Sequence, residues 1–332
     1  MFAASQIVAR DVAELVAALK ACTASCVILL SPGDWRDVRI EHIDAHATIT
    51  GKDAVIHDLR VAKSSGITFS NLEFSSAGAK PGVWGASHDN WFGVYDSTDI
   101  QFDHVRVHGD PNGTFATTSS GLMIRTSSNV KVSYSDFSHL YHAVTFLTDE
   151  KLLLDHNQFH DLFDDAMRGG GTSWITISNN VCSSNHPDAA DMDHPDCIQF
   201  WTANATAPAH DITITDNRYD RGTAHPTQFI FLGNEKNLPY ENVRITGNRA
   251  FGSLWAGIAI SNAHNVVIEK NTLISSCRID GPQLIRSRIT FGGIDGLSLF
   301  DNVAGEILER PPNPNKTQGN NRIAGCMDHS PF

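Results

Sequence analysis

NVRITGNRAFGSLWAGIAISNAHNVVIEKNTLI, residues 242–274, contains the pattern that decides the fold. A motif of the form apolar-x-apolar-x-x-Asn ends at Asn248 and again at Asn271. Between the two, Gly257–Ser261 alternates with the period of two that is typical of a β-strand, and helical spacing is absent. The segment is therefore interpreted as one repeat of short strands and polar turns.

The same motif recurs along most of the chain. Its Asn position is occupied by Asn157, Asn180, Asn217, Asn248, Asn271 and Asn302, and by Ser135 in an earlier repeat. In five repeats an apolar residue lies 13 residues before this position, namely Leu122, Val144, Met167, Ile258 and Ile289. A unit of 22–23 residues with short strands is typical of one coil of a parallel β-helix, whose stacked coils bury a continuous core. We expect the Asn side chains to form a hydrogen-bonded ladder with a structural role.

The start of the chain lies outside the repeat. Asp11–Ala21 carries Val12, Leu15, Val16 and Leu19 at helical spacing. This spacing predicts an amphipathic helix that caps the open end of the core, where apolar side chains and strand edges would otherwise be exposed.

A family resemblance supports the same fold. Residues 12–40, VAELVAALKACTASCVILLSPGDWRDVRI, resemble the cap and first strand of right-handed parallel β-helix polysaccharide lyases. The coils resemble the wider pectate-lyase-like superfamily, which includes lyases, uronate epimerases, glycoside hydrolases and phage tailspikes. We therefore predict an all-β, right-handed parallel β-helix solenoid with an N-terminal capping helix. It forms one domain over residues 1–332, with the cap at about 1–30, coils at about 31–308 and a C-terminal tail at 309–332.

Composition excludes several classes of function. With 25 basic and 37 acidic side chains the formal charge is −12, which argues against a nucleic-acid-binding surface. The longest apolar runs, such as Cys26–Leu30, are far shorter than the roughly 18 residues that a membrane helix needs. We expect neither nucleic acid nor membrane insertion, and nothing in the sequence indicates an oligomeric state.

Six cysteines form an even count. We expect Cys22 to pair with Cys26, and Cys277 with Cys326, which would imply an oxidising compartment. The alternative is that they are buried free thiols. Although Met1–Arg10 lacks the charged start and apolar stretch of a signal peptide, we expect a secreted or periplasmic protein.

Aligning the coils reveals two columns with ionisable residues. The first column reads Ser120, His142, Asp165, Asp196, Gln228 and Ala256, and the second reads Met123, Thr145, Arg168, Gln199, Phe231 and Ala259. Stacked coils lie about 4.8 Å apart. We therefore expect His142, Asp165 and Asp196 to be neighbours, with Arg168 and Gln199 beside them in one groove. The alternative is that Asp and His begin turns here and bond to local backbone.

An insertion follows these columns, in SSNHPDAADMDHPD at residues 183–196. Long loops on a rigid solenoid usually line its binding face. Asp188, Asp191 and Asp193 supply oxygen ligands suited to Ca²⁺, the one cofactor that the sequence suggests. DHPD, ending at Asp196, resembles the Asp-Pro-His-Asp motif of alginate epimerases with two residues exchanged. This resemblance implies that His194 and Asp196 are catalytic candidates.

Two further features concern substrate and alternatives. Aromatic faces commonly stack on sugar rings, and the candidates are Trp201, Phe231, Tyr95 and Tyr141, whose alternative role is packing beneath the turns. Arg125 is a candidate contact for an acidic sugar, or a solvated surface group. FDDAM at residues 163–167 resembles the paired-Asp coil of polygalacturonase-type hydrolases, but the partner motifs of that family are missing.

These residues favour a polysaccharide lyase that cleaves a uronate-containing glycan by β-elimination. His194 or His142 would take the C5 proton, and Arg168 would neutralise the uronate carboxylate. Tyr141 would protonate the leaving oxygen. Asp165 and Asp196 would orient the His or hold a metal.

Other readings of the same residues stay open. One is a glycoside hydrolase or tailspike-like depolymerase with Asp165 and Asp196 as acid and base. Others are a uronate C5-epimerase and a non-catalytic glycan binder. Because Arg168 has no apolar role in its column, we expect Arg168→Ala to abolish turnover with little loss of stability.

Overall fold

In the computed structural model, placement is described for residues 5–78, 90–186, 194–203, 205–279 and 284–332. The chain forms two compact units, Met1–Gln158 and Phe159–Phe332. In both, short strands pair in parallel with the strand one coil away, so the all-β fold predicted from the repeat is confirmed.

The first unit contains three parallel stacks, and its capping helix α1 spans Val12–Ala21. The first stack is β4 (Val38–Glu41), β7 (Leu59–Ala62), β10 (Asn90–Tyr95), β13 (Ser120–Arg125) and β16 (Val144–Leu147). The second is β1 (Ser5–Ala9), β2 (Cys26–Leu30), β5 (Asp44–Thr50), β8 (Ser65–Ser70), β11 (Thr98–Asp103), β14 (Lys131–Ser133) and β17 (Leu153–Asp155). The third is β3 (Gly33–Trp35), β6 (Ala54–Ile56), β9 (Glu73–Ser75), β12 (Arg106–His108) and β15 (Asp136–Ser138). A short 3₁₀ turn spans Phe115–Thr117, and β18 (Gln158–His160) spans the boundary of the units.

The second unit repeats this arrangement. Its first stack is β19 (Met167–Gly170), β22 (Asp196–Phe200), β25 (Gln228–Leu232), the starts of β28 (Ala256–Glu269) and β30 (Arg288–Phe300), and β32 (Glu306–Glu309). The second is β20 (Ile175–Ser178), β23 (His210–Thr215), β26 (Tyr240–Thr246), the ends of β28 and β30, and β33 (Thr317–Gly319). The third is β21 (Val181–Ser183), β24 (Arg218–Asp220), β27 (Arg249–Phe251), β29 (Thr272–Ile274), β31 (Val303–Ala304) and β34 (Arg322–Ile323).

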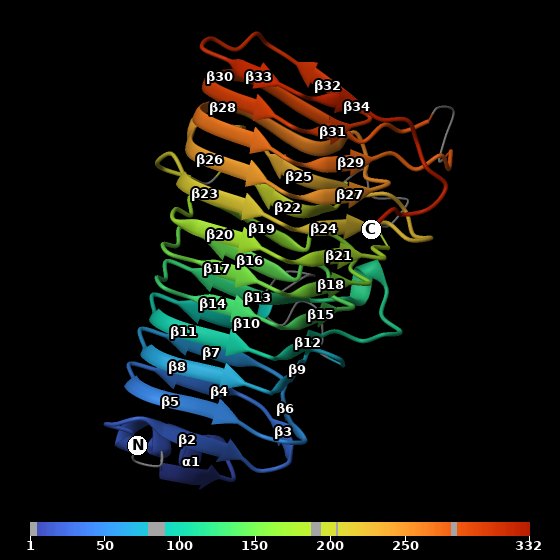
Figure 1. The fold of residues 1–332 in the computed structure, drawn as a ribbon. Coiled ribbons are helices and arrows are strands. Elements are labelled where there is room, and N and C mark those ends of the chain that lie inside the picture. The colour runs from blue at the N-terminus through green and yellow to red at the C-terminus, as the bar shows by residue number, and fades with distance from the viewer. Residues whose placement is uncertain (1–4, 79–89, 187–193, 204, 280–283) are drawn as a thin grey trace. The chain divides into compact units, whose positions relative to one another are not determined.

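The capping helix forms where the spacing predicts it. The Asp11 carboxylate accepts a hydrogen bond of 2.8 Å from the backbone N–H of Glu14, which satisfies a free donor of the first turn. Leu15 and Leu19 are fully buried against the first strands, and α1 lies beside β2 in Figure 1. No helix among the described residues is long and apolar enough to cross a membrane.

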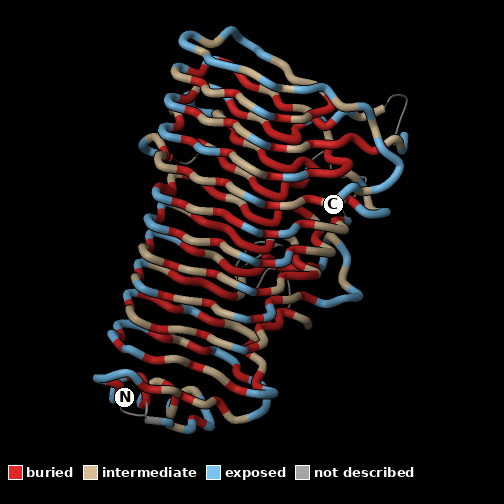
Figure 2. The backbone as a smooth tube through the Cα atoms, in the orientation of Figure 1, coloured by how far each residue is buried: buried red, intermediate tan, exposed pale blue. Residues whose placement is uncertain are grey.

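The core of each unit follows from strand alternation. In Figure 2 buried residues recur at corresponding places in successive coils. In the first unit phenylalanines stack from coil to coil, as Phe69 and Phe102 do with ring centroids 5.0 Å apart. In the second strand stack of the second unit aliphatic side chains occupy the inward places, among them Ile214 and Ile245, which face each other across β23 and β26.

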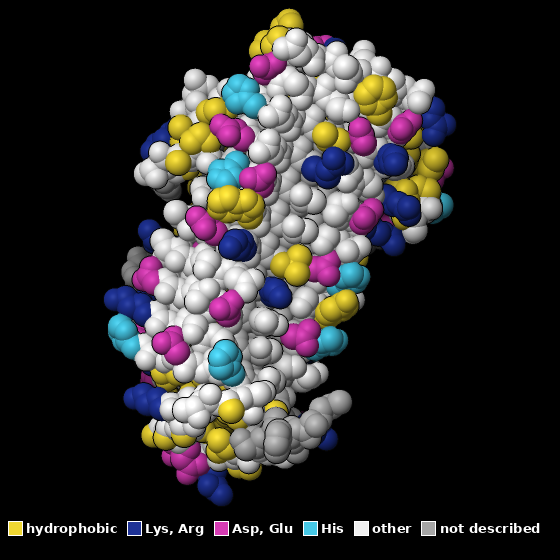
Figure 3. Space-filling view, turned by 60° about the vertical axis from the view of Figure 1, so that its left-hand side comes forward, with side chains coloured by type: hydrophobic (Ala, Val, Ile, Leu, Met, Phe, Trp, Pro, Cys, Tyr) yellow, Lys and Arg dark blue, Asp and Glu magenta, His cyan; other side chains and the backbone are white. Residues whose placement is uncertain are grey.

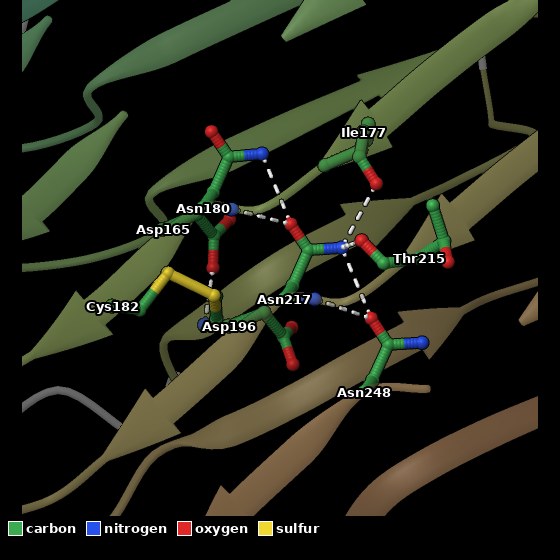
Figure 4. The surroundings of a disulfide bond; sticks show 9 residues. Asp165, Ile177, Asn180, Cys182, Asp196, Thr215, Asn217 and Asn248 are labelled. Carbon is green, nitrogen blue, oxygen red and sulfur yellow. Dashed lines mark hydrogen bonds between the residues drawn. A yellow bond between two sulfur atoms is a disulfide. The ribbon is translucent and has the colours of Figure 1, made fainter. Parts of the chain in front are cut away.

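The predicted asparagine ladder is present in the second unit. Each Asn donates from Nδ2 to Oδ1 of the next at 3.0 Å, in the order Asn180, Asn217, Asn248, Asn271, Asn302 and Asn321. Figure 4 shows Asn180, Asn217 and Asn248 of this series. In the first unit Asn157 accepts from the backbone N–H of Ser135 at 3.0 Å, as Asn217 does from the backbone N–H of Asn180 in the second unit.

The ladder also changes the boundary expected near residue 308. Residues 309–332, expected as a tail, include β33 and β34. Asn321 continues the ladder, because its Oδ1 accepts from both the backbone N–H and the side chain of Asn302. This last repeat therefore adds a further coil.

Three disulfides hold the coils. The predicted pairs Cys22–Cys26 and Cys277–Cys326 are both present, and the sequence interpretation missed a third, Cys182–Cys197. The third joins β21 to β22 and lies beside Asp196 (Figure 4).

Candidate functional site

The strands β19 and β22 bring together four of the predicted site residues. Their register places Met167 opposite Ile198 and Arg168 opposite Gln199. Asp165 lies two residues before β19, and Asp196 is the first residue of β22. The column that the repeat spacing predicts is therefore confirmed in the second unit.

Carboxylates form the inner layer of this site. Asp164, Asp165 and Asp196 are 3%, 2% and 0% exposed. Oδ1 of Asp165 accepts a hydrogen bond of 2.7 Å from the backbone N–H of Asp196, and Figure 4 shows these two residues, which come from neighbouring coils. Gln199 donates from Nε2 to Oδ2 of Asp196 at 2.9 Å. The contact of Asp165 with backbone joins two coils, so it is not the local contact that the expected alternative describes.

A single guanidinium group lies over these carboxylates. Nη1 of Arg168 is 3.1 Å from Oδ2 of Asp165 and 3.8 Å from Oδ2 of Asp164. Its side chain is 24% exposed, so it connects the buried layer to the surface. The expectation that Arg168→Ala would cost little stability stays a prediction, but the structure gives a reason for a larger cost, because the change removes an ion pair with buried carboxylates.

An aromatic ring supports the outer side of Arg168. Cζ of Arg168 is 4.7 Å from the centre of the Trp201 ring. This stack requires Trp201 to lie close to β19, where its backbone N–H donates to the Gly169 carbonyl at 2.9 Å. A Cβ at Gly170 would lie 2.5 Å from the Trp201 carbonyl oxygen. The glycines after Arg168 thus allow the approach of the chain's own Trp201.

Two further predicted residues of the second unit, His194 and Phe231, lie at its surface. His194 is exposed, and its ring centroid is 6.3 Å from that of Phe231. Phe231 follows Gln199 in the same column, opposite it in β25. Arg168, Gln199, Trp201, Phe231 and His194 therefore supply the partly or fully exposed groups around the buried carboxylates.

Four predicted residues belong to the first unit. Nδ1 of His142 is 3.2 Å from Oγ of Ser120, and the Tyr141 ring packs edge-on against Phe115 at 5.2 Å. Their place beside Asp165 and Arg168 stays a prediction. Tyr95 and Arg125 face each other across β10 and β13. The proposed Ca²⁺ ligands Asp188, Asp191 and Asp193 lie outside the described residues.

The sequence interpretation missed some contacts. One is the second contact of Arg168, with Asp164, which the column of Asp165 does not include because adjacent residues of a strand usually face opposite ways. Gln228 continues the Asp165–Asp196 column, and its buried Oε1 accepts a hydrogen bond from none of the residues that the structure describes. The sequence signal that could have identified Gln228 as a site residue is its position in the same column as Asp165 and Asp196.

Surface charge is mixed on the face of the molecule that Figure 3 shows. On the face in Figure 3, Lys and Arg side chains are interspersed with Asp and Glu. Such a surface gives no long-range attraction for a polyanion. Binding of an acidic substrate would therefore depend on local groups such as Arg168.

Comparison with known proteins identifies the fold. Residues 120–304, more than half of the chain, match the family described as "Right handed beta helix region". No curated protein sequence matches the chain.

Solved structures with the same fold have distant sequences. PfbA, a surface adhesin of Streptococcus pneumoniae, has a TM-score of 0.55 and 13% identity, over 98% of this chain and 92% of PfbA. DFA-IIIase from Arthrobacter chlorophenolicus A6 has a TM-score of 0.51 and 14% identity, over 95% and 87%. The Agl-KA catalytic domain has a TM-score of 0.52 and 13% identity, over 98% and 69%. At such identities the likeness is one of fold.

Proposed function

The chain belongs to the right-handed β-helix family, and on that premise we propose that it is a polysaccharide lyase acting on a uronate-containing glycan. The fold alone does not distinguish a lyase from a hydrolase or a binding protein, since an adhesin and a DFA-IIIase share it. The observation that carries the proposal is the Arg168 guanidinium, which is held by buried carboxylates and supported by the Trp201 ring.

Exposure favours elimination over hydrolysis. A glycosidase needs its two carboxyl groups in contact with the sugar, flanking the scissile bond. Asp165 and Asp196 are 2% and 0% exposed. The group that reaches the surface is instead the Arg168 cation, whose planar donors suit a uronate carboxylate.

The reaction assigns these residues distinct tasks. Removing the C5 proton places negative charge on the uronate carboxylate, which Arg168 neutralises. A base, His194 or His142, takes this proton, and its pair of electrons forms the C4–C5 double bond as the C4–O bond breaks. Tyr141 gives its proton to the leaving oxygen. Asp165 and Asp196 act as positioning residues for Arg168 and Gln199.

Substrate binding uses the groups beside Arg168. Trp201 and Phe231 offer aromatic surface for sugar rings, and Gln199 offers an amide for their hydroxyls. Three disulfides fit an oxidising compartment, so we propose a secreted or periplasmic protein.

One observation favours hydrolysis as the second candidate. Three buried carboxylates lie in this layer, with one guanidinium against two of them. Burial disfavours the charged form of a carboxyl group, and a neutral carboxylic acid is what a glycosidase uses as its proton donor. Asp165 and Asp196 would then be the acid and base.

A polysaccharide panel with two readouts separates these functions. A lyase raises ultraviolet absorbance through its unsaturated product, whereas a hydrolase releases reducing ends without that absorbance. We expect Arg168→Lys, which keeps the cation but not its planar fork, to lower kcat by about 100-fold. The matched control is Arg244→Lys on the exposed side of β26, with kcat unchanged. Reducing ends without absorbance, or full turnover by Arg168→Lys, would overturn the proposal.

A further inference from the structure

A cavity lies in the first unit, on the outward side of β4, β7 and β10. Its volume is about 380 Å³, and its lining includes Arg39, Asp58, Arg60, Trp91 and Tyr95. Small-molecule sites commonly measure about 300–1,000 Å³ and combine apolar walls with a few polar groups. The cavity has both the size and the composition of such a site.

The strand register builds the cationic side of this cavity. Arg39 and Arg60 are opposite each other in β4 and β7, and Arg60 is opposite Gly93 in β10. A Cβ at Gly93 would lie 2.3 Å from Cε2 of Tyr95, so only glycine leaves room for that ring. The ring packs over Gly93, and Cζ of Arg60 is 4.4 Å from its centre. This stack holds the guanidinium in place at the cavity wall.

Several hydrogen-bond donors of the cavity have no acceptor. Nε1 of Trp91 is buried and donates to none of the described residues. Arg60 donates to Glu41 through Nε at 3.2 Å, and no described residue accepts from its terminal nitrogens. A buried donor without an acceptor is costly. The cavity is therefore suited to a ligand that brings oxygen acceptors.

The polar groups also indicate the kind of ligand. Arg39 donates to Oδ1 of Asp58 at 2.8 Å, so the lining carries two cations and one anion. Arg125 faces Tyr95 from the next strand and adds a further cation beside it. Burial raises the pKa of the Tyr95 phenol, which keeps this group neutral and able to donate. An acidic ligand with an apolar face meets these conditions.

We propose that this cavity binds one uronate residue of a glycan, as a binding site in its own right. The sugar ring packs against Trp91 and Tyr95, and its carboxylate accepts from the terminal nitrogens of Arg60. Its hydroxyls bond to the Arg39–Asp58 pair. The proposal does not rest on the lyase activity, because none of these residues acts in the elimination.

The test measures binding in the full chain carrying Arg168→Lys, which slows turnover of the ligand. Calorimetry compares trigalacturonate and trimannuronate with neutral maltotriose. We expect one of the two uronate trimers to bind, with an affinity that falls as salt rises. Adding Arg60→Gln or Trp91→Phe should weaken this binding by about tenfold. Arg106→Gln, at an exposed arginine of β12 outside the cavity, is the control and should leave the affinity unchanged.

Three results would overturn the proposal. They are equal binding of maltotriose, no binding of either uronate trimer, and unchanged affinity in both cavity variants. The lyase activity of the unmodified chain is measured separately, and its outcome does not depend on these binding results. If the chain binds a uronate trimer through Arg60 and yet cleaves no polysaccharide, that result contradicts the proposed lyase activity and supports the binding site.

Discussion

The backbone N–H of Asp196 donates to Oδ1 of Asp165 across 2.7 Å, while Oδ2 of the same carboxylate faces Nη1 of Arg168. One side chain thus joins the start of β22 to the guanidinium on β19. Because the first contact fixes the plane of the carboxylate, it also fixes the direction from which Arg168 is held. The strand pairing of the solenoid therefore determines where the cation lies.

The first prediction concerns the stability provided by this ion pair. Arg168→Ala should lower the free energy of unfolding by about 2–3 kcal/mol, less than for a fully buried pair because Arg168 is 24% exposed. Adding Asp165→Asn removes one of the uncompensated charges and should restore part of the loss. Urea unfolding measures both. If Arg168→Ala and the unmodified chain are equally stable, the ion pair between Arg168 and Asp165 does not stabilise the fold.

The second prediction concerns the approach of Trp201 to β19. In Gly170→Ala the new Cβ would meet the Trp201 carbonyl oxygen at 2.5 Å and its Nε1 at 3.2 Å. We expect Trp201 to shift from Arg168, with KM raised several-fold and stability lowered by about 1–3 kcal/mol. Gly325→Ala, where a Cβ meets nothing within 4 Å, is the matched control. Unchanged kinetics in Gly170→Ala would show that the stack has no role in binding.

The third prediction concerns a buried acid in the first unit. Asp149 occupies the turn position held by Ser64, Ser97 and Ser127 in earlier coils, and it accepts from the backbone N–H groups of Ser127 and Leu147 at 2.8 Å. Burial raises the pKa of the Asp149 carboxyl from 3.8 to about 7. The folded chain therefore holds a proton that the unfolded chain releases, and stability falls as pH rises from about 4 to about 7.

The variant Asp149→Ser tests this linkage. A serine here can accept from Ser127 and donate to the Leu147 carbonyl, as the earlier serines do in their own coils. We expect it to remove a pH-dependent loss of at most about 4 kcal/mol. Thermal unfolding at pH 4.5 and pH 7.5 should show a smaller difference in Tm for the variant. An identical difference in both proteins would rule Asp149 out as its source.

The fourth prediction concerns the disulfide beside Asp196. Cys182 and Cys197 are 15 residues apart, and a loop of this length gives about 3 kcal/mol of stability in the chain-entropy account. Replacing both with Ala should cost about this amount. Replacing Cys22 and Cys26, only 4 residues apart, should cost less. Chemical denaturation ranks the two pairs, and a larger loss for Cys22–Cys26 would be the contrary result.

The repeat spacing predicted the solenoid because each coil is specified by residues that lie close together in the sequence. Each Asn of the ladder must be buried and bonded to the next coil, so its spacing records the length of a coil. The same spacing placed Arg168 opposite Gln199 correctly. Asp11–Ala21 likewise carries its helical period and its N-cap in adjacent residues.

What the sequence did not predict depends on side-chain direction and on distant partners. Asp165 and Asp196 were expected to face a groove, but the backbone contact and Gln199 hold them in a buried layer. The Cys182–Cys197 bond crosses an insertion whose path no spacing specifies. The arginine column of the first unit, Arg39 and Arg60, lies in coils where the Asn motif is only loosely kept.

The asparagine ladder of the second unit has a mechanical consequence. Each interior Asn from Asn217 to Asn302 is bonded to the Asn of the coil before it and to the Asn of the coil after it. A pulling force applied at Phe332 reaches the ladder through the Cys277–Cys326 disulfide, whose loop encloses Asn302 and Asn321, so it first loads the rungs at Asn271 and then those at Asn248. Rupture of a rung exposes the next without weakening those further along. Under tension this part of the molecule would lengthen in a series of similar steps, one coil at a time.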